Sequence, residues 1–371
     1  MRPETGAVNP PASCLRPPAL KRQEKMTVIQ EKSSIDWTRF AAMVQQAKRF
    51  LLTAHVRPDG DCIGSELAMA AMLRQLGKEV RILNVDQVPP DLKFLENADK
   101  IEFIDTFHDH EWLETVDLLM VLDTLSWAQL GRMKPFLQNT KGKIVVIDHH
   151  AKGDEIDAEI FSDTHAEATG RLVFEAAVHL GVTITPAMAT ALYVAIATDT
   201  GWFRFSSVTA KTHQAIAKLV EAGAVPHVVY NHLYEQESIG KIRLIGKTLS
   251  KVESFLDGKL TFTSILLDDF VACGAIPSDS EDIINQTLRI DGTEMALIVV
   301  EQRTGGFKIS FRSRCAVDCS QVAAQFGGGG HRQASGAFQN LPLDELKHAL
   351  IRAMTDAYHA VADGCGSLWY E

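Results

Sequence analysis

The sequence predicts an α/β protein, in which a doubly wound parallel-sheet domain is followed by a second, smaller α/β domain. From about residue 35, short and near-continuous apolar runs alternate with helical stretches. This alternation is typical of parallel strands that helices cover on both faces. After about residue 250, strand-like runs joined by hairpin turns are interleaved with helices. A chain of 371 residues is long enough for two domains of ordinary size.

The first predicted domain covers residues 35–218. Its strands are expected over residues 49–55, 78–84, 101–105, 116–123 and 143–148, and its helices over 61–77, 168–181 and 186–201. The apolar run at 101–105 is the weakest of the strand candidates. A helical stretch interrupted by Gly223, Pro226 and Gly240 follows. It predicts a helical connector over residues 219–250.

The second predicted domain covers residues 251–371. Strands are expected within 251–267, 294–314 and 334–338, and helices within 279–290, 320–327 and 344–361. At the other end of the chain, residues 1–34 are rich in proline and lack the apolar core of a signal peptide. They predict a disordered tail, and Met26 is an alternative start.

Composition narrows the class of protein. A net charge of −10 argues against a protein that coats long nucleic acid through a basic field. Six scattered cysteines without a CxxC pair indicate free thiols in a reducing compartment. No apolar stretch approaches the length of about 20 residues that a membrane span needs. The sequence therefore predicts a cytoplasmic protein without membrane association.

Carboxylates and imidazoles gather where three predicted strands and one helix end. They are His55, Asp59 and Asp61 after the first strand, Asp123, then Asp148, His149 and His150, and finally Asp199. Taken singly, these groups have structural explanations: Asp123 as a helix cap, or HVRPDGD as a turn before a helix that Asp61 caps. Buried strands rarely end in three consecutive ionisable residues, because burying such groups unpaired is costly. Their joint occurrence favours a metal site.

The ligand types indicate which ion is bound. Carboxylates and imidazoles without a thiolate suit a hard to borderline divalent cation, with Mn²⁺ first and Mg²⁺ or Co²⁺ as substitutes. One ion cannot use all these ligands and still bind a substrate, whereas two ions about 4 Å apart can, with one aspartate bridging them. Such a pair activates water and neutralises a phosphoryl group, which predicts metal-assisted hydrolysis of a phosphoester or phosphoanhydride.

A second unusual stretch lies in the C-terminal part of the chain. The run GGGG at 327–330 is followed by His331, and the strand before it ends with Arg312, Ser313 and Arg314. Successive glycine N–H groups can form an anion-binding nest, and arginine suits bidentate phosphate contact. A flexible linker with surface arginines is the alternative. A predicted helix before the run and a strand after it favour contact with a phosphate or nucleotide.

Together these motifs resemble the DHH phosphoesterase superfamily, over roughly residues 35 to 365. The matching stretches are HxxPDGDxxGS from His55 to Ser65, the aspartate at 123, the DHH triplet at 148–150, TDTG from Thr198 to Gly201, and FRSR with GGGGHxxASG in the second domain. The latter resemble the DHHA1 module. Within the superfamily the chain is most similar to the branch of bifunctional oligoribonucleases (nanoRNases) and 3′-phosphoadenosine 5′-phosphate (pAp) phosphatases.

The resemblance implies a role for each matching residue. His55, Asp59 and Asp123 would hold one metal; Asp61, Asp123, His149 and Asp199 would hold the other. His150 would face the scissile phosphate, with Asp148 orienting the imidazoles. In the second domain, Arg312, Ser313 and the loop Gly328, Gly329, Gly330 and His331 would bind the nucleotide in a cleft between the domains. Short RNA oligonucleotides and pAp would be the substrates, and a homodimer is implied.

Other members of the superfamily offer alternatives. A cyclic-dinucleotide phosphodiesterase acting on c-di-AMP or pApA shares the motifs, but its best-known forms carry membrane and sensory segments. Family II pyrophosphatases lack the GGGGH loop, and RecJ-type exonucleases carry additional nucleic-acid-binding modules. A non-catalytic nucleotide-binding regulator would be free to lose metal ligands, and none is missing here. The hydrolysis of nanoRNA and pAp is therefore the favoured prediction.

Overall fold

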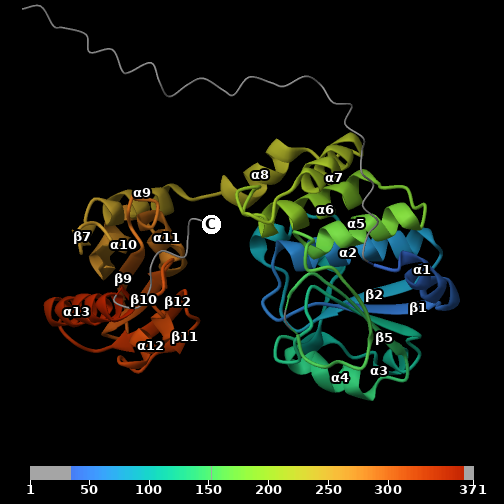
Figure 1. Cartoon of the computed structure of the whole chain (residues 1–371), viewed down its shortest axis with the longest axis horizontal. Helices are drawn as coiled ribbons and strands as arrows, with labels where there is room; N and C mark the ends of the chain where they lie inside the picture. Colours follow the sequence, from blue (N-terminus) through green and yellow to red (C-terminus); the bar gives the residue numbers. More distant parts are fainter. Residues whose placement is uncertain (1–34, 152, 363–371) are drawn as a thin grey trace, which may run out of the picture. The chain divides into compact units, whose positions relative to one another are not determined.

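The computed structural model describes residues 35–151 and 153–362, which form two compact units (Figure 1). Unit 1 extends to Val229, and unit 2 begins at Tyr230. The predicted tail over 1–34 lies outside the described residues. Nowhere in the described part of the chain is a helix long and apolar enough to cross a membrane. The domain limits and the interdomain cleft expected from the sequence stay predictions.

Unit 1 is built on a six-stranded parallel sheet. Its strands are β1 (Arg49–Thr53), β2 (Glu79–Asn84), β3 (Glu102–Phe103), β4 (Leu118–Leu122), β5 (Lys143–Asp148) and β6 (Glu159–Ser162). They lie in the order β3–β2–β1–β4–β5–β6, and every neighbouring pair is parallel. The order reverses between β1 and β4. In doubly wound sheets, ligands bind at the carboxyl ends of the strands at this reversal.

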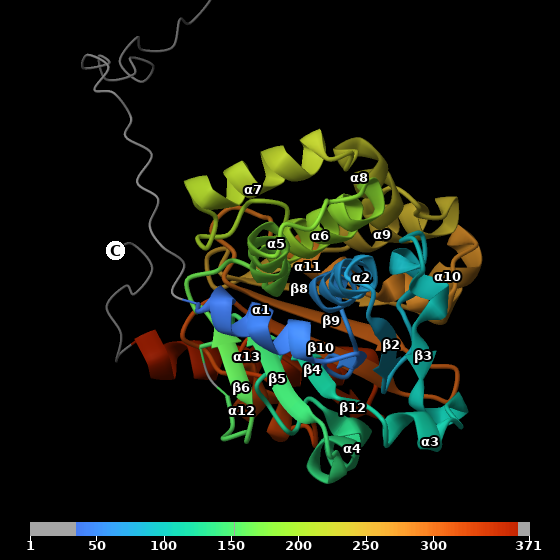
Figure 2. The ribbon, with the colours of Figure 1, turned by 90° about the vertical axis from the view of Figure 1, so that its right-hand side faces the viewer.

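Helices cover both faces of this sheet (Figure 2). The helices of this part of the chain are α1 (Trp37–Gln46), α2 (Gly60–Gln75), α3 (His110–Leu113), α4 (Lys134–Asn139), α5 (Thr169–His179), α6 (Pro186–Asp199), α7 (Ala210–Glu221) and α8 (Pro226–Tyr234), with short 3₁₀ turns between several of them. Among them, α6 packs on α2 and α5, α7 packs on α6, and α8 spans the boundary between the two units. On one face, Leu51 and Leu119 pack with Met133 and Leu137. Their strand neighbours point the other way and are buried as well, so the strands read as continuous apolar runs.

The predicted α/β class is confirmed, and each predicted strand of unit 1 is present. The run at 101–105 supplies only the two residues of β3. β6 is not among the predicted strands, because only one of its four side chains is buried and it lacks the apolar run of an interior strand. The sequence analysis also missed α1, α3 and α4. The last two span only 4 and 6 residues, too few for a helical period to stand out.

Unit 2 has a six-stranded mixed sheet. Its strands are β7 (Glu253–Phe255), β8 (Leu260–Ile265), β9 (Met295–Glu301), β10 (Phe307–Ser313), β11 (Gly329–Gly330) and β12 (Ala334–Gln339), in the order β11–β12–β10–β9–β8–β7. Only the β8–β9 pair is parallel. The helices are α9 (Ile239–Leu249), α10 (Leu267–Cys273), α11 (Ile283–Thr287), α12 (Cys319–Ala324) and α13 (Leu343–Ala362). The predicted smaller α/β fold is present, with α10 and β11 in addition.

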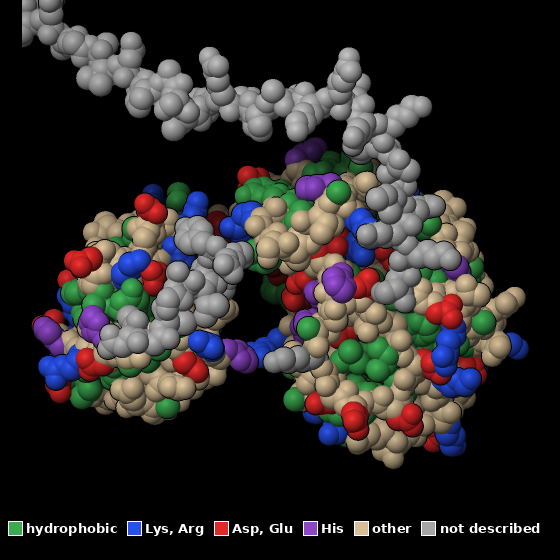
Figure 3. Space-filling model, viewed as in Figure 1, with side chains coloured by type: hydrophobic (Ala, Val, Ile, Leu, Met, Phe, Trp, Pro, Cys, Tyr) green, Lys and Arg blue, Asp and Glu red, His purple; other side chains and the backbone are tan. Residues whose placement is uncertain are grey.

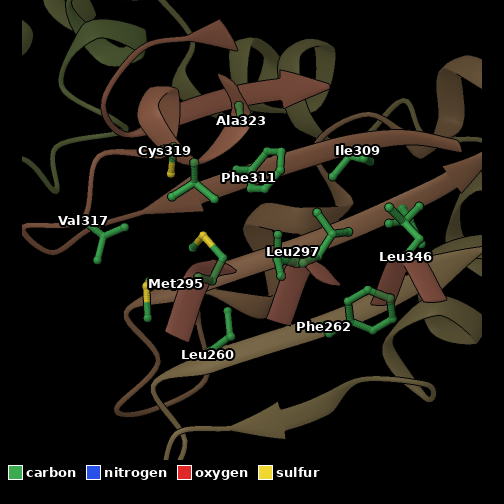
Figure 4. Close-up of a cluster of buried hydrophobic side chains, with 14 of the residues drawn as sticks. Leu260, Phe262, Met295, Leu297, Ile309, Phe311, Val317, Cys319, Ala323 and Leu346 are labelled. Carbon is green, nitrogen blue, oxygen red and sulfur yellow. The ribbon is translucent and has the colours of Figure 1, made fainter. Parts of the chain in front are cut away.

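The sheet of unit 2 is also buried on both faces. Figure 4 shows one apolar cluster, in which Phe262, Leu297 and Phe311 from the strands meet Ala323 of α12 and Leu346 of α13. On the other face, Ile298 and its neighbours pack against α9, α10 and α11. Each unit therefore has its own core, as expected for a domain.

Three helices of unit 1 approach each other closely at glycines. A Cβ on Gly64 of α2 would lie 2.3 Å from the backbone carbonyl oxygen of Ala191 in α6. A Cβ on Gly60 would lie 2.4 Å from Oγ1 of Thr198, and one on Gly170 of α5 would lie 2.4 Å from Cβ of Ala195. This packing brings the start of α2, the start of α5 and the end of α6 together at one place.

We expect Gly64→Ala to destabilise unit 1 by about 1–3 kcal/mol, because a backbone carbonyl cannot move aside cheaply. The matched control is Gly246→Ala in α9, where nothing lies within 4 Å and alanine should stabilise the helix by about 0.4–1 kcal/mol. Urea unfolding followed by circular dichroism measures both. Tryptophan fluorescence reports mainly on unit 1, which contains four of the five tryptophans, Trp37, Trp112, Trp127 and Trp202. A stabilising effect of Gly64→Ala would show that these helices are not held at glycine distance.

Candidate metal centre

The predicted ligands of unit 1 come together at the carboxyl ends of β1, β4 and β5. Three overlapping groups have ligand atoms within 4.8 Å of one another: His55, Asp59, Cys62 and Asp123; Asp123, His149 and His150; and Asp61, His149 and Asp199. Asp123 belongs to two groups, and so does His149. The cluster therefore lies at the reversal point of the sheet, where the fold class places ligands.

The two aspartates at the start of α2, Asp59 and Asp61, make different contacts. Oδ1 of Asp59 accepts hydrogen bonds from the N–H groups of Asp61 (3.0 Å) and Cys62 (3.1 Å), so Asp59 caps the helix. Its Oδ2 faces Nε2 of His55 at 3.9 Å. The alternative in which Asp61 caps α2 is wrong, because the helix begins at Gly60 and Asp61 lies inside its first turn.

Asp61 instead binds the start of α5. Its carboxylate accepts hydrogen bonds from the backbone N–H groups of Thr169 (2.6 Å) and Gly170 (2.8 Å) and from the hydroxyl of Ser65 (3.1 Å). Ala168, at the N-cap position of α5, supplies no side-chain cap. A buried carboxylate from one helix thus satisfies the free N–H groups of another, where the helix dipole favours a negative charge.

Two histidines are oriented by backbone carbonyl groups. Nδ1 of His55 lies 2.8 Å from the carbonyl oxygen of Val56, and Nδ1 of His149 lies 3.2 Å from that of Ala166. A carbonyl can only accept, so Nδ1 carries the proton in both rings when they are neutral. Nε2 is then a lone-pair donor directed at the carboxylates. This arrangement, with the far ring nitrogen bonded to a backbone oxygen, is typical of metal-binding histidines.

Asp123 lies at the centre of the cluster and is 2% exposed. It follows β4 in the left-handed region, with φ of 64°, a conformation that non-glycine residues keep mainly at functional positions. Its Oδ2 faces Nε2 of His55 at 3.6 Å, and its Oδ1 faces Nε2 of His149 at 3.6 Å. Each oxygen of Asp123 therefore faces a different imidazole.

Asp148 organises the DHH turn. Its fully buried Oδ1 accepts hydrogen bonds from the N–H groups of His149 (2.8 Å) and His150 (3.3 Å) and lies 2.7 Å from Nδ1 of His150. This last bond raises the pKa of His150 to about 8, although partial burial opposes the shift. Asp148 thereby fixes both the backbone of the turn and the orientation of one ring.

The cluster is electrostatically unbalanced. Burial, and then the charges of Asp123 and Asp199, raise the pKa of Asp61 well above its usual range. Burial also raises the pKa of Asp199 to about 6. Burial alone would lower the pKa of His55, but its contacts with Asp123 and the Val56 carbonyl reverse this and raise it to about 9. The crowded carboxylates thus favour additional positive charge in their midst.

The donors fit a divalent cation. Nε2 of His149 is buried without a hydrogen-bond partner, and it lies 3.5 Å from Oδ2 of Asp199, 3.6 Å from Oδ1 of Asp123 and 3.8 Å from Oδ2 of Asp61. These separations are too long for hydrogen bonds but suit ligands around a common ion. Oxygen and imidazole donors match the preferences of hard to borderline metals. This acidic and histidine-rich cluster can therefore bind a metal.

Sequence reasoning missed several residues around the cluster. Thr169 and Ser65 bind the ligand carboxylates directly. Glu66 is fully buried and accepts a hydrogen bond from Asn84, and burial raises the pKa of Glu66 to about 8. Asn84 in turn accepts from the N–H of Ala54, just before His55. Thr169 lies at a helix start, where threonine is common, and Ser65 lies inside α2, so neither residue type signals a contact with a ligand carboxylate.

The predicted nucleotide-binding residues all belong to unit 2. Arg314 donates from Nε to the carbonyl oxygen of Thr293 at 2.7 Å, Arg312 donates to the carbonyl oxygen of Phe311 at 3.0 Å, and the Ser313 side chain is buried beside Cys315. His331 is exposed, and its N–H bonds the carbonyl oxygen of Ala334. Their role toward a nucleotide stays a prediction.

The glycine run of unit 2 is largely explained by the end of α12 and the β11–β12 hairpin that follows it. Gly327 has φ of +68° and Gly330 has φ of +142°, conformations that side chains rarely adopt. A Cβ on Gly328 would lie 2.1 Å from the carbonyl oxygen of Gly336 in β12. Gly329 differs, because a Cβ there would meet nothing and its φ lies outside the positive range. The fold therefore requires three of the four glycines and leaves Gly329 unexplained.

Asp199→Asn should have opposite effects on stability without and with metal. The raised pKa of Asp199 means that ionisation between about pH 4 and pH 6 destabilises the metal-free fold, because the folded state holds this proton more tightly than the unfolded state. At pH 8, after chelation, we expect the variant to melt at a higher temperature than the wild type. With Mn²⁺ the wild type should melt at the higher temperature, because it binds the ion more tightly than the variant and is therefore stabilised more.

The control for this measurement is Asp157→Asn, at an exposed aspartate outside the cluster. It should melt like the wild type in both conditions. Thermal melts at pH 4 and pH 8, with chelator and with Mn²⁺, give the full comparison. If Mn²⁺ raises the melting temperature of Asp199→Asn as much as that of the wild type, Asp199 is excluded as a ligand.

Known proteins share sequence or fold with most of this chain. The model of the DHH family, N-terminal domain, matches residues 49–196. The bifunctional oligoribonuclease and PAP phosphatase NrnA of Thermus thermophilus is 31% identical, over 82% of this chain and 89% of its own length. That of Bacillus subtilis is 27% identical, over 77% and 88%.

A crystal structure of an exopolyphosphatase-related protein from Bacteroides fragilis matches with a TM-score of 0.76. It is 25% identical, and the match covers 88% of this chain and 96% of that chain. The family model covers the part of unit 1 that carries His55, Asp123 and the triplet at 148–150. The relatives extend this similarity over most of the chain. The protein belongs to the DHH phosphoesterase family.

Proposed function

We propose that this protein is a phosphoesterase that hydrolyses short oligoribonucleotides to mononucleotides and pAp to AMP and phosphate. Mn²⁺ is the favoured metal, with two ions bound. The observation that carries the proposal is the cluster at the ends of β1, β4 and β5, where two imidazole Nε2 atoms and the carboxylates face one another. The names of the relatives from Thermus thermophilus and Bacillus subtilis supply the substrate class.

Each ion would have its own ligand set. His55, Asp59 and Asp123 would hold one ion, and Asp61, Asp123, His149 and Asp199 the other, with Asp123 shared. Bound divalent cations lower the pKa of water and neutralise phosphoryl oxygens. Asp123 supports the sharing by geometry, because its two oxygens face the two different histidines at 3.6 Å each.

His150 would act on the scissile phosphate. Its side chain is 49% exposed, and its Nδ1 is engaged by Asp148. The second ring nitrogen, Nε2, remains available to a bound substrate. From there His150 can donate a hydrogen bond to a phosphoryl oxygen or a proton to the leaving oxygen. Asp148 would keep the ring in this orientation.

The first experiment supplies the purified protein and Mn²⁺ with separate substrates: pAp, a 5′-phosphorylated RNA dinucleotide, a long RNA, cyclic di-AMP and pyrophosphate. We expect rapid turnover of pAp and the dinucleotide and slow turnover of the others. Asp123→Ala should lower kcat by on the order of 1,000-fold, since loss of a shared ligand removes several kcal/mol of transition-state stabilisation. Asp157→Asn should retain wild-type turnover.

The outcomes separate the alternatives. Preferential cleavage of cyclic di-AMP would assign the protein to cyclic-dinucleotide phosphodiesterases while retaining the metal centre. Absence of turnover on all five substrates would support a non-catalytic nucleotide-binding regulator. An Asp123→Ala variant that folds normally by circular dichroism and keeps its activity would refute the metal site itself.

We further propose that Arg312, Ser313, Arg314 and the loop from Gly328 to His331 bind the nucleotide, and Gly329 gives the sharpest test. Gly329→Ala should change the stability of the fold by less than about 0.5 kcal/mol, because the new methyl group meets nothing in the protein. If substrate lies against this backbone, KM for the dinucleotide should rise about tenfold or more.

Gly246→Ala is the matched control, because it adds the same methyl group in unit 2 at another exposed position with nothing within 4 Å. It should leave KM unchanged. Steady-state kinetics and urea unfolding of both variants complete the test. A wild-type KM for Gly329→Ala would indicate that the glycine run serves only the local fold of unit 2.

A further inference from the structure

Two side chains outside the predicted ligand set contact the shared ligand. The hydroxyl of Thr169 donates to Oδ1 of Asp123 at 3.0 Å, and the thiol of Cys62 donates to Oδ2 of the same carboxylate at 3.4 Å. Both donors are fully buried, so water does not compete with these bonds. Each oxygen of Asp123 thus has one side-chain donor of its own.

The same two oxygens face different halves of the cluster. Oδ1, bound by Thr169, lies 3.6 Å from Nε2 of His149, and Oδ2, bound by Cys62, lies 3.6 Å from Nε2 of His55. The two oxygens of a carboxylate are equivalent, so a half-turn about the Cβ–Cγ bond restores the same contacts. Smaller rotations break them, and donors on both sides, which come from different helices, hold the carboxylate plane against such rotations.

We infer that Thr169 and Cys62 are positioning residues that orient the two oxygens of Asp123 separately, Thr169 for the ion held with His149 and Cys62 for the ion held with His55. This inference rests on the proposed two-ion site. It assigns no ligand role to either side chain. Thr169 is the stronger case, since a hydroxyl is a better donor than a thiol and its bond is shorter.

Thr169 also binds Asp61, but through its backbone N–H at 2.6 Å. Substitution can therefore separate the two contacts. Thr169→Val keeps the shape and the backbone N–H and removes only the bond to Asp123, whereas Thr169→Ser keeps a hydroxyl. Cys62→Ala removes the donor on the other oxygen.

The test is calorimetric titration of Mn²⁺ into chelator-stripped protein without substrate, so that binding is measured apart from turnover. We expect two ions in the wild type. Thr169→Val should weaken one of them by about 10- to 100-fold and the other by less than about threefold, because loss of an outer contact to a ligand typically has this effect on metal affinity. Thr169→Ser should restore wild-type binding. Cys62→Ala should weaken the other ion, and by less.

Ligand variants identify which ion is affected. Adding Thr169→Val to Asp199→Asn should change the remaining site little, whereas adding it to Asp59→Asn should show the full loss. Equal weakening of both ions, no change in either, or failure of serine to restore binding would overturn the inference. Thr169→Ala provides the same comparison if the valine variant does not fold.

The outcomes also separate this inference from the proposed function. Two ions in the wild type with no turnover of any nucleotide would refute the proposed reaction and leave the positioning roles standing. Normal turnover of the nucleotide substrates by the wild type, together with unchanged affinities for both ions in Thr169→Val, would support the proposed reaction and refute the positioning roles. Fewer than two ions in the wild type would refute the two-ion site and the assignment of the two oxygens together.

Discussion

The crowding of carboxylates at one edge of a parallel sheet is the constraint on which the rest of unit 1 depends. Asp61, Asp123 and Asp148 are each 2% exposed or less, so none of them relies on water for solvation. Each is compensated in another way: Asp61 by two N–H groups at a helix start, Asp148 by the N–H groups of its own turn, and Asp123 by two side-chain donors and flanking imidazoles. Backbone hydrogen bonds thus stabilise negative charge that an unstructured chain would leave to solvent.

Helix packing and site chemistry are two aspects of the same arrangement. The glycines of α2 and α5 let helices meet at distances that a methyl group would forbid, and the contact between Gly60 and Thr198 lies directly beside Asp61 and Asp199. The motif HVRPDGDCIGS therefore combines ligands and packing residues in one stretch. Its glycines allow the helices to pack closely, and this packing places its aspartates next to the other carboxylates of the cluster. A change at either kind of residue alters the distances between ligand oxygens.

The sequence was sufficient for the fold class and for the residues that meet at the strand ends, because apolar runs and consecutive ionisable residues leave few other arrangements. It was insufficient where the signal is not local. Nothing in the residues that flank Thr169 indicates that its hydroxyl donates a hydrogen bond to Asp123, which lies far earlier in the chain. The alternative in which Asp61 caps α2 failed for the same reason, since its carboxylate binds the start of α5. Two of the four consecutive glycines, Gly328 and Gly330, lie too close to β12 to carry a side chain, which becomes visible only once β12 is paired.

The dependence of α5 on a cap from another helix has a consequence for how the chain acquires its structure. The residue that satisfies the first N–H groups of α5 lies 108 positions earlier in the sequence, so an isolated α5 segment begins without it. Short helices without caps are marginal in water. Full ordering of the start of this helix therefore depends on the docking of α2, which also brings Asp61 to the other aspartates of the cluster. A chain in which α2 has not docked lacks both the cap of α5 and the assembled carboxylates.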